Sequence, residues 1–213
     1  VYGNQQWATV DAGALSTCGV TTGGTGWCWG AGYLGALGDG SMLMGQSEPV
    51  AVAAPASGAV TWRSLAVGES TVCGITTEAA LYCWGQNQYG QLGDQTTINR
   101  SVPTEPYRAW AVAWAAAAPS YLNTCATTTT GNLYCWGYGA YGQTMVGSQT
   151  APTVVSDTRL RTVIGVTAGL YHTCGIVDQD ALWCWGDGSS GQLGNGSTAG
   201  GGAYVVAGSR TWA

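Results

Sequence analysis

The sequence predicts an all-β fold built from four β-propeller-type blades, and three observations support this prediction. The eight cysteines form four pairs, and the two members of each pair are ten residues apart. The pairs recur at intervals of 55, 52 and 49 residues, so the whole chain is an internal repeat. Each pair brackets short β-branched and aromatic runs around a polar turn, which is the pattern of a β-hairpin. Three to four short strands in about 50 residues make one propeller blade.

We expect a single repeat domain over residues 1–213 that is part of a larger propeller or array. Its repeats span approximately 1–57, 58–109, 110–158 and 159–208, and residues 209–213 begin a further repeat. A propeller exposes unpaired strand edges until its ring closes. An isolated four-blade arc is therefore expected to be unstable alone.

Each repeat begins with an apolar anchor that lies eleven residues before the first cysteine. Three repeats have a glycine six residues after the anchor, but the third has Ser120 there, directly after Pro119. We therefore expect an altered backbone at that turn. Residues 110–118 are alanine-rich, yet Pro119 and the repeat alignment favour a strand over a helix. The anchors are Trp7, Trp62, Trp114 and Val163.

A hairpin follows each anchor and ends in an aromatic-Cys-Trp-Gly run. In the second repeat, residues 70–76 and 81–84 flank a polar turn. Successive strand residues point to opposite faces of a sheet. If this turn centres on Glu78, Cys73 lies directly opposite Cys83.

A glycine-rich tetrapeptide begins five residues after the glycine of each aromatic-Cys-Trp-Gly run. It is clearest as Gly90-Gln-Leu-Gly93 and Gly191-Gln-Leu-Gly194. We interpret these tetrapeptides as tight turns that need positive φ, and not as phosphate-binding loops.

Two motifs at a fixed offset, Cys-Trp-Gly and Gly-Gln-Leu-Gly, are clearest in residues 82–94 and 183–195. The unit that they form resembles the regulator of chromosome condensation repeat. Residues 67–74 and 168–175 also resemble the first-strand signature of that family. The resemblance covers the whole chain and implies a β-propeller, usually of seven blades. It implies little about activity, because propellers host unrelated functions.

The sequence argues against nucleic-acid binding by overall charge and against a transmembrane helix. Charged residues make up only 8% of the chain, there is no lysine, and the net charge is −5. Binding of nucleic acid by overall charge is excluded, because phosphate neutralisation needs clustered lysine and arginine. The sequence also has no run of about 18 apolar residues, so we expect no transmembrane helix.

We predict one disulfide within each hairpin. Directly opposed strand residues supply the Cβ separation of about 3.5–4.5 Å that a disulfide needs. Free buried thiols are an alternative, and so is zinc, which is disfavoured because there is no Cys-x-x-Cys and only one histidine, His172. Disulfides imply an oxidising compartment, so the predicted location is extracellular or at the cell surface. The predicted pairs are Cys18–Cys28, Cys73–Cys83, Cys125–Cys135 and Cys174–Cys184.

The sequence gives no support for catalysis, and we predict no catalytic residue, metal site or cofactor. His172 has no repeated acidic partner. The resemblance implies a structural role for it, because the first-strand signature of the family often has a histidine at this position. Ultraviolet sensing by tryptophan clusters, as in a related plant propeller family, is disfavoured because its Gly-Trp-Arg-His-Thr motif is absent. The regular tryptophans are instead predicted to fill the wedge between blades, with a ligand-stacking surface as the alternative: Trp29, Trp84, Trp136 and Trp185.

Two N-glycosylation sequons, at Asn99 and Asn195, follow glycine-rich tetrapeptides. The sequon at Asn123 is poorer, because its third residue is the paired Cys125. We predict that Asn99 and Asn195 are exposed and carry glycans in a eukaryotic host.

The leading functional hypothesis is a non-enzymatic extracellular structural or adhesive repeat protein, the building block of a surface assembly or filament. Its partners are other copies or further repeats of the same protein, with Trp7 and Trp212 at the junctions. The first alternative is a secreted propeller that binds or inhibits a partner protein through its blade loops, as one bacterial β-lactamase inhibitor with this type of propeller does. Nucleotide exchange on a small GTPase, the activity of the family's founder, is less favoured. The loop aromatics that would serve as contacts are Tyr33, Tyr89, Tyr107, Trp110 and Tyr141.

Overall fold

The computed structural model describes residues 3–177 and 181–205 as four sheets of four antiparallel strands each. The first blade contains β1 (Trp7–Ala12), β2 (Ser16–Thr21), β3 (Gly26–Ala31) and β4 (Gly45–Ala51). The second contains β5 (Trp62–Val67), β6 (Thr71–Thr76), β7 (Leu81–Gly85) and β8 (Arg100–Thr104). The third contains β9 (Trp114–Pro119), β10 (Asn123–Thr128), β11 (Leu133–Gly137) and β12 (Gln149–Val154). The fourth contains β13 (Val163–Ala168), β14 (His172–Val177), β15 (Ala181–Gly186) and β16 (Gly201–Val205).

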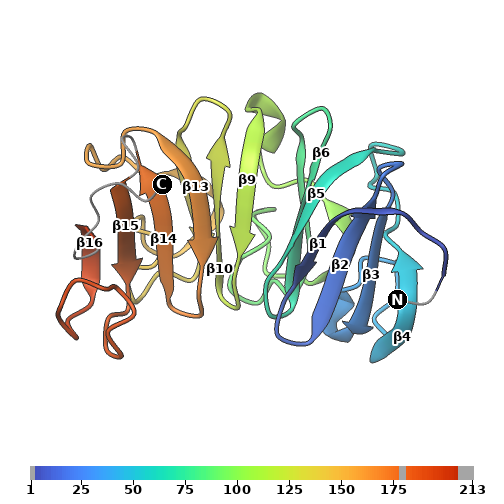
Figure 1. Cartoon of the computed structure of the whole chain (residues 1–213), viewed down its shortest axis with the longest axis horizontal. Coiled ribbons are helices and arrows are strands. Elements are labelled where there is room, and N and C mark those ends of the chain that lie inside the picture. Colours follow the sequence, from blue (N-terminus) through green and yellow to red (C-terminus); the bar gives the residue numbers. More distant parts are fainter. Residues whose placement is uncertain (1–2, 178–180, 206–213) are drawn as a thin grey trace.

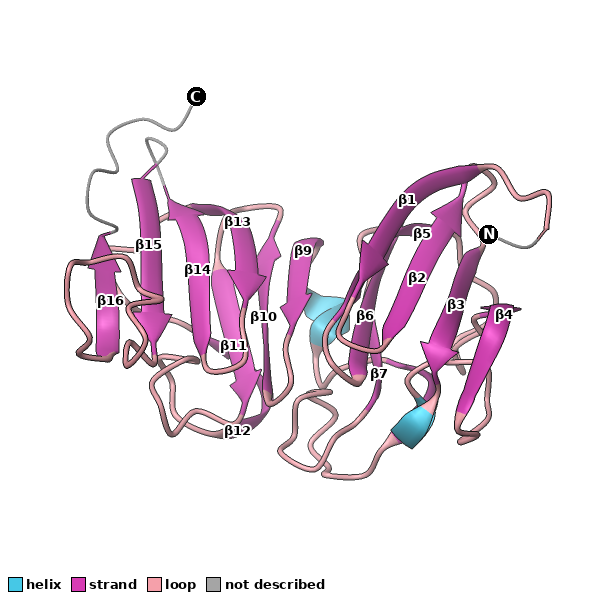
Figure 2. Cartoon of the chain, turned by 60° about the horizontal axis from the view of Figure 1, so that its bottom comes forward, coloured by secondary structure: helices cyan, strands magenta, loops and turns pink. Residues whose placement is uncertain are grey.

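Each sheet is a meander whose strands pair in sequence order. The four sheets follow one another along an arc, with the N-terminal blade on the right of Figure 1 and the C-terminal blade on the left. Figure 2 shows the same order from another side. The first strands of neighbouring blades contact one another, so β1, β5, β9 and β13 line the inner side of the arc. This is the blade arrangement that the sequence predicts.

The predicted hairpin register is confirmed in all four blades. Cys73 pairs directly with Cys83 across β6 and β7, and their Cα atoms are 4.1 Å apart. The Cα atoms of directly opposed residues in a non-hydrogen-bonded antiparallel pair are about 4.5 Å apart, which suits a cross-strand disulfide. The structure contains the four disulfides Cys18–Cys28, Cys73–Cys83, Cys125–Cys135 and Cys174–Cys184.

The glycine-rich tetrapeptides are tight turns with positive φ, as predicted. Gly90 and Gly93 have φ values of 79° and 76°, and the turn closes by a hydrogen bond from Gly93 N to Gly90 O of 2.9 Å. Met145 takes the place of the last glycine in the third blade and still has a φ of 60°. The turn is therefore required by the fold, even where its sequence changes.

One local expectation for the third blade is wrong, and a second is confirmed for most of its length. Ser120 does not alter its turn, because its N–H donates to Asn123 O at 2.8 Å, as Gly68 N does to Thr71 O. The strand favoured in the alanine-rich stretch is present and begins at the anchor Trp114, after a short 3-10 helix at Ala109–Ala111. That helix is held by a hydrogen bond of 2.9 Å from Trp114 Nε1 to Ala109 O.

Helices contribute little to this fold. Besides the turn at Ala109–Ala111, a second 3-10 helix covers Tyr33–Gly35. Among the residues that the structure describes, no helix is long and apolar enough to cross a membrane.

Removing one disulfide is expected to destabilise the chain measurably. Each bridge closes a hairpin between residues ten apart, and the loss of such a closure costs about 2–3 kcal/mol on the chain-entropy model. We expect Cys125→Ala/Cys135→Ala to lower the free energy of unfolding by this amount in urea titrations. Peptide mapping without reductant should find all four bridges in the parent chain. Bridges between repeats, or free thiols in most pairs, would contradict the structure.

Candidate functional site

Every blade has two chemically different faces. The cysteine and tryptophan of the Cys-Trp-Gly run are adjacent in one strand, so their side chains point to opposite sides of the sheet. In the second blade Cys83 belongs to the buried cluster shared with the third blade, whereas Trp84 belongs to the cluster shared with the first. We call these two sides of a blade its cysteine face and its tryptophan face.

At each junction between described blades, the cysteine face of one blade packs against the tryptophan face of the next. Cys73 and Cys83 lie in one buried cluster with Trp114 and Trp136. The first and second blades pack in this way, and so do the third and fourth. The disulfides therefore lie inside the junctions, against aromatic rings.

A repeated hydrogen bond fixes how the two faces meet. Trp136 Nε1 donates to the carbonyl oxygen of Gln91 at 2.8 Å, and Thr124 Oγ1 donates to the same oxygen at 2.8 Å. Gln91 is the second residue of the glycine-rich tetrapeptide of the preceding blade. The other two junctions have the equivalent bonds Trp84 Nε1 to Ala36 O at 3.1 Å and Trp185 Nε1 to Gln143 O at 2.8 Å.

The tryptophan face of the first blade is not covered by another described blade. Val10 on this face is 67% exposed, whereas Leu65, its equivalent in the second blade, is 5% exposed. Trp29 is only half-buried, although its three equivalents are completely buried. Among the described residues, Trp29 Nε1 and Thr17 Oγ1 have no acceptor. The donors of a junction are present here without their partner.

The cysteine face of the fourth blade is likewise not covered by another described blade. Ile176 is 40% exposed, whereas its equivalents Val20 and Ile75 are 1% and 2% exposed. Cys174 and Leu182 line a shallow apolar cavity beside it. Gln192 occupies the tetrapeptide position whose carbonyl oxygen accepts the indole hydrogen bond at the other junctions. The two ends of the arc thus present the two kinds of face that meet at each internal junction.

The structure describes only one of the two predicted assembly residues, and the assembly role of both stays a prediction. Trp7 begins β1 and packs against Trp29 on the uncovered tryptophan face, with ring centroids 5.6 Å apart. Trp212 lies outside the described residues, and its role stays a prediction. The predicted wedge tryptophans are buried between blades except Trp29, which no described blade covers.

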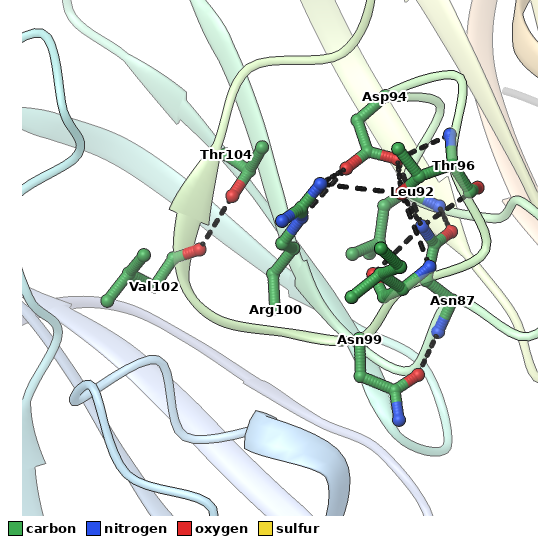
Figure 3. A network of polar contacts seen from close by, with 9 residues as sticks. Asn87, Leu92, Asp94, Thr96, Asn99, Arg100, Val102 and Thr104 are labelled. Carbon is green, nitrogen blue, oxygen red and sulfur yellow. Dashed lines mark hydrogen bonds and ion pairs between the residues drawn. The ribbon is translucent and has the colours of Figure 1, made fainter.

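The sequon at Asn99 lies in a loop that a polar network holds in place (Figure 3). Asn99 is half-buried, and its Oδ1 accepts a hydrogen bond of 2.8 Å from Asn87 N. The side chain of Asn87 is completely buried and donates to Asp94 Oδ1 at 3.0 Å. Among the described residues the Asn99 Nδ2, the atom that a glycan modifies, makes no hydrogen bond. Glycosylation of Asn99 stays a prediction.

Asn195 is half-buried and has a structural role of its own. Its Oδ1 accepts a hydrogen bond from Ser197 N at 3.0 Å, an Asx turn. Asp94, one residue after the tetrapeptide of the second blade, forms the same turn with Thr96 N. Glycosylation of Asn195 therefore also stays a prediction, whereas Asn123 is completely buried and cannot be an exposed acceptor.

The only histidine, His172, is half-buried at the start of β14. Burial lowers its pKa, and the nearby charge of Asp187 opposes that shift. The described residues contain no group of three or more His, Cys, Asp or Glu side chains that could hold a metal ion. The structural role predicted for His172 stays a prediction.

The aromatic residues predicted in loops are exposed. Their exposed fractions range from 40% to 75% and are highest at Trp110. Sequence reasoning missed Tyr138 and Tyr171, whose rings contact Tyr141. No sequence signal identifies the contact between Tyr141 and Tyr171, because Tyr171 belongs to another blade. The exposed loop aromatics are Tyr33, Tyr89, Tyr107, Trp110 and Tyr141.

Comparison with known proteins supports the repeat at the level of sequence. A family model described as "Regulator of chromosome condensation (RCC1) repeat" matches residues 62–91, 120–143 and 163–192, and a second model with this description matches residues 78–106. The Ultraviolet-B receptor UVR8 of Arabidopsis thaliana is 31% identical over 149 residues, which is 68% of this chain and 33% of the relative. The mitochondrial RCC1 domain-containing protein RUG3 of the same plant is 32% identical over 130 residues, 61% of this chain and 28% of the relative. The chain spans about a third of the length of these relatives.

Solved structures show the fold. Human WBSCR16 superimposes with a TM-score of 0.86 at 21% identity, covering 96% of this chain and 54% of its own. Prp20p from Saccharomyces cerevisiae, whose binding to Gsp1p and histones was characterised with its structure, gives a TM-score of 0.78 at 17% identity, covering 98% and 52%. At these identities the likeness establishes an RCC1-type β-propeller fold and nothing about partners.

The indole hydrogen bond is expected to contribute measurably to stability at a covered junction only. Trp136→Phe leaves Gln91 O with one donor fewer inside a buried interface, which should lower the free energy of unfolding by about 1–2 kcal/mol. Trp29→Phe is the matched control, because Trp29 Nε1 has no acceptor among the described residues. Urea unfolding of both variants tests this, and equal losses would contradict the assigned role.

Asp94 is expected to make stability depend on pH in the acid range. Burial raises the pKa of this carboxyl, but hydrogen bonds from Thr96 and Arg100 outweigh burial and hold it below its ordinary value of 3.8. A depressed carboxyl pKa gives stability that is present above pH 3.8 and lost as the pH falls through the folded-state pKa. We expect Asp94→Asn to be about 1 kcal/mol less stable at pH 7, with the difference shrinking below pH 4.

The control for Asp94 is Asp39→Asn, at the same turn of the first blade. Asp39 accepts from Ser41 at 2.9 Å and 2.7 Å but forms no ion pair among the described residues. Urea unfolding at pH 7 and pH 3 compares the two variants. A pH-independent loss in Asp94→Asn would show that its charge does not matter.

Proposed function

The chain belongs to the regulator of chromosome condensation (RCC1) repeat family, and from that premise we propose that it is a non-enzymatic structural building block. Its two uncovered blade faces dock onto further blades of the same kind, which other copies or further repeats of the protein supply. The product is an extended or closed assembly with more than four blades.

One observation carries this proposal: the uncovered faces are complementary. The first blade offers the donors Trp29 Nε1 and Thr17 Oγ1 on a tryptophan face, and the fourth offers a cysteine face with Gln192 at the acceptor position. Each internal junction joins such a pair of faces. A contact between unlike faces of identical units is heterologous, so it propagates as a filament unless its rotation closes a ring.

Chemistry supports an oxidising location for this assembly. Each blade has a disulfide at its centre, and disulfides persist mainly in extracellular and other oxidising compartments. The low content of charged residues and the absence of lysine suit a surface that is covered in an assembly. We therefore propose an extracellular or cell-surface structure, with glycans at Asn99 and Asn195 in a eukaryotic host.

Self-association is expected to depend on both faces. Val10→Asp on the tryptophan face and Ile176→Asp on the cysteine face each place a charge where a dry contact is proposed. We expect size-exclusion chromatography with light scattering to show concentration-dependent species larger than one chain for the parent protein. Either variant should reduce them at least tenfold. Val10→Lys mixed with Ile176→Asp should restore association, because the opposite charges meet across the junction.

The matched control is Ile98→Asp, since Ile98 is 61% exposed in the loop before β8 and belongs to neither face. A folded parent chain that stays monomeric at all concentrations would overturn the proposal. Equal association of the three aspartate variants would also overturn it.

The second candidate function is binding of a partner protein through the blade loops. The specific observation in its favour is the exposure of aromatic loop residues, above all Trp110 at 75%. Arg108 lies over the ring of the neighbouring Tyr107, at 5.2 Å from its centroid. Exposed tryptophan, tyrosine and arginine are the residue types that dominate binding energy at interfaces.

A further inference from the structure

Four tyrosines form a continuous row across three blades. The ring centroids of Tyr89 and Tyr138 are 5.4 Å apart, those of Tyr138 and Tyr141 6.1 Å, and those of Tyr141 and Tyr171 4.7 Å. We call these four residues the tyrosine row. Tyr89 follows β7, Tyr138 and Tyr141 follow β11, and Tyr171 lies between β13 and β14. The loops after the first and third strands of an antiparallel blade lie at the same edge, which is the lower edge of the arc in Figure 1.

The row is exposed and its backbone is held in place. Tyr89 and Tyr141 are 40% and 48% exposed, and the two other rings are half-buried. Tyr89 N donates to Gln91 Oε1 at 2.9 Å, and Tyr141 N donates to Gln143 Oε1 at 3.0 Å. Both glutamines are completely buried. An exposed aromatic surface on ordered loops is preorganised for binding, because little freedom remains to be lost.

We propose that the tyrosine row binds a proline-rich peptide segment in the polyproline II conformation, with a basic residue at the Tyr171 end. Proline-rich segments dock into aromatic-lined grooves, and their preformed helix loses little entropy on binding. Their backbone carbonyls have no internal hydrogen bonds, and tyrosine hydroxyls can donate to them.

The angles between the rings favour this ligand over a glycan. Adjacent rings in the row are inclined at 59°, 63° and 47°, so they do not form one flat platform. A proline ring can pack against inclined aromatic rings, whereas a sugar stacks on a flat face and needs polar side chains around it. The two glutamine amides next to the row offer a sugar little, because Gln91 Nε2 donates to Tyr121 O at 3.1 Å and Gln143 Nε2 is buried although it has no partner among the described residues.

Charge at one end of the row gives the ligand its direction. Asp187 N donates to Tyr171 O at 2.9 Å, so the backbones of these two residues are adjacent, and the Asp187 carboxylate accepts from Ser189 and from Gln192 Nε2 on the same loop. A hydrogen bond from Ser189 N holds the pKa of the Asp187 carboxyl below its ordinary value, so it is ionised at neutral pH. The whole chain has 11 acidic residues against 6 arginines. A basic ligand residue is therefore attracted to this end, and an acidic one is repelled.

Titration with a fluorescent peptide tests the proposal on the intact 213-residue chain. The probe is a proline-rich peptide with one terminal arginine, and its control replaces every proline by glycine or serine and keeps the arginine. We expect anisotropy to show at least tenfold tighter binding of the proline peptide. Tyr141→Ala should weaken that binding at least tenfold, whereas Tyr33→Ala, at an equally exposed tyrosine of the first blade, should leave it unchanged.

Asp187→Asn tests the direction of the ligand: it removes the charge and keeps an oxygen that accepts from Ser189 N, although the bonds that Oδ2 accepts from Ser189 Oγ and Gln192 Nε2 are lost. It should weaken the arginine-bearing peptide severalfold and leave a neutral proline peptide unaffected. Thermal unfolding of each variant checks that it is folded. Equal affinity for the two peptides, equal effects of Tyr141→Ala and Tyr33→Ala, or binding of a neutral oligosaccharide without binding of the peptide would each overturn the proposal.

Discussion

The hydrogen bond from a buried indole to the carbonyl oxygen of the preceding blade is the interaction on which the rest of the structure depends. In the first two blades it brings the tryptophan face against the last glycine of the turn, where a side chain would collide with the indole: a Cβ on Gly93 would lie 2.8 Å from Trp136 Nε1. Gly38 and Trp84 are related in the same way, with a separation of 2.5 Å. The glycine spacing and the Cys-Trp-Gly run are thus two halves of one contact that neighbouring repeats make.

The disulfides serve this contact by fixing strand register. Cysteine and tryptophan are adjacent in the third strand, so a slip of one residue would turn the indole to the cysteine face. A bridge between directly opposed residues such as Cys125 and Cys135 excludes that slip. Each blade is small and contains few charged residues. One covalent bond gives it both stability and a unique strand register.

The parts of the fold that repeat were predictable from the sequence, and the parts that depend on contacts between blades were not. Opposed cysteines and positive-φ turns follow from local spacing, since each is decided within about ten residues. The unaltered turn at Ser120 was not predictable, because the glycines at the equivalent positions are not required by backbone conformation. Neither Gly13 nor Gly68 has a positive φ. Gly13 is a glycine because blades pack closely there, and a Cβ on it would collide with Gly68 O. The tyrosine row was missed because Tyr141 and Tyr171 are brought together only by the packing of two blades.

The assembly and the ligand binding that we propose are compatible, because they use different parts of each blade. The proposed association buries the broad faces at the two ends of the arc, whereas the row lies on the loop edge and crosses the junctions between the second, third and fourth blades. The same buried bonds that join those blades, from Thr124 and Trp136 to Gln91 O and from Trp185 to Gln143 O, also set the distance between successive tyrosines. A change that loosens a junction should therefore disturb the row, whereas a change to the row leaves the uncovered faces intact. The proposed ligand binding therefore depends on blade packing, whereas blade packing does not depend on the tyrosine row.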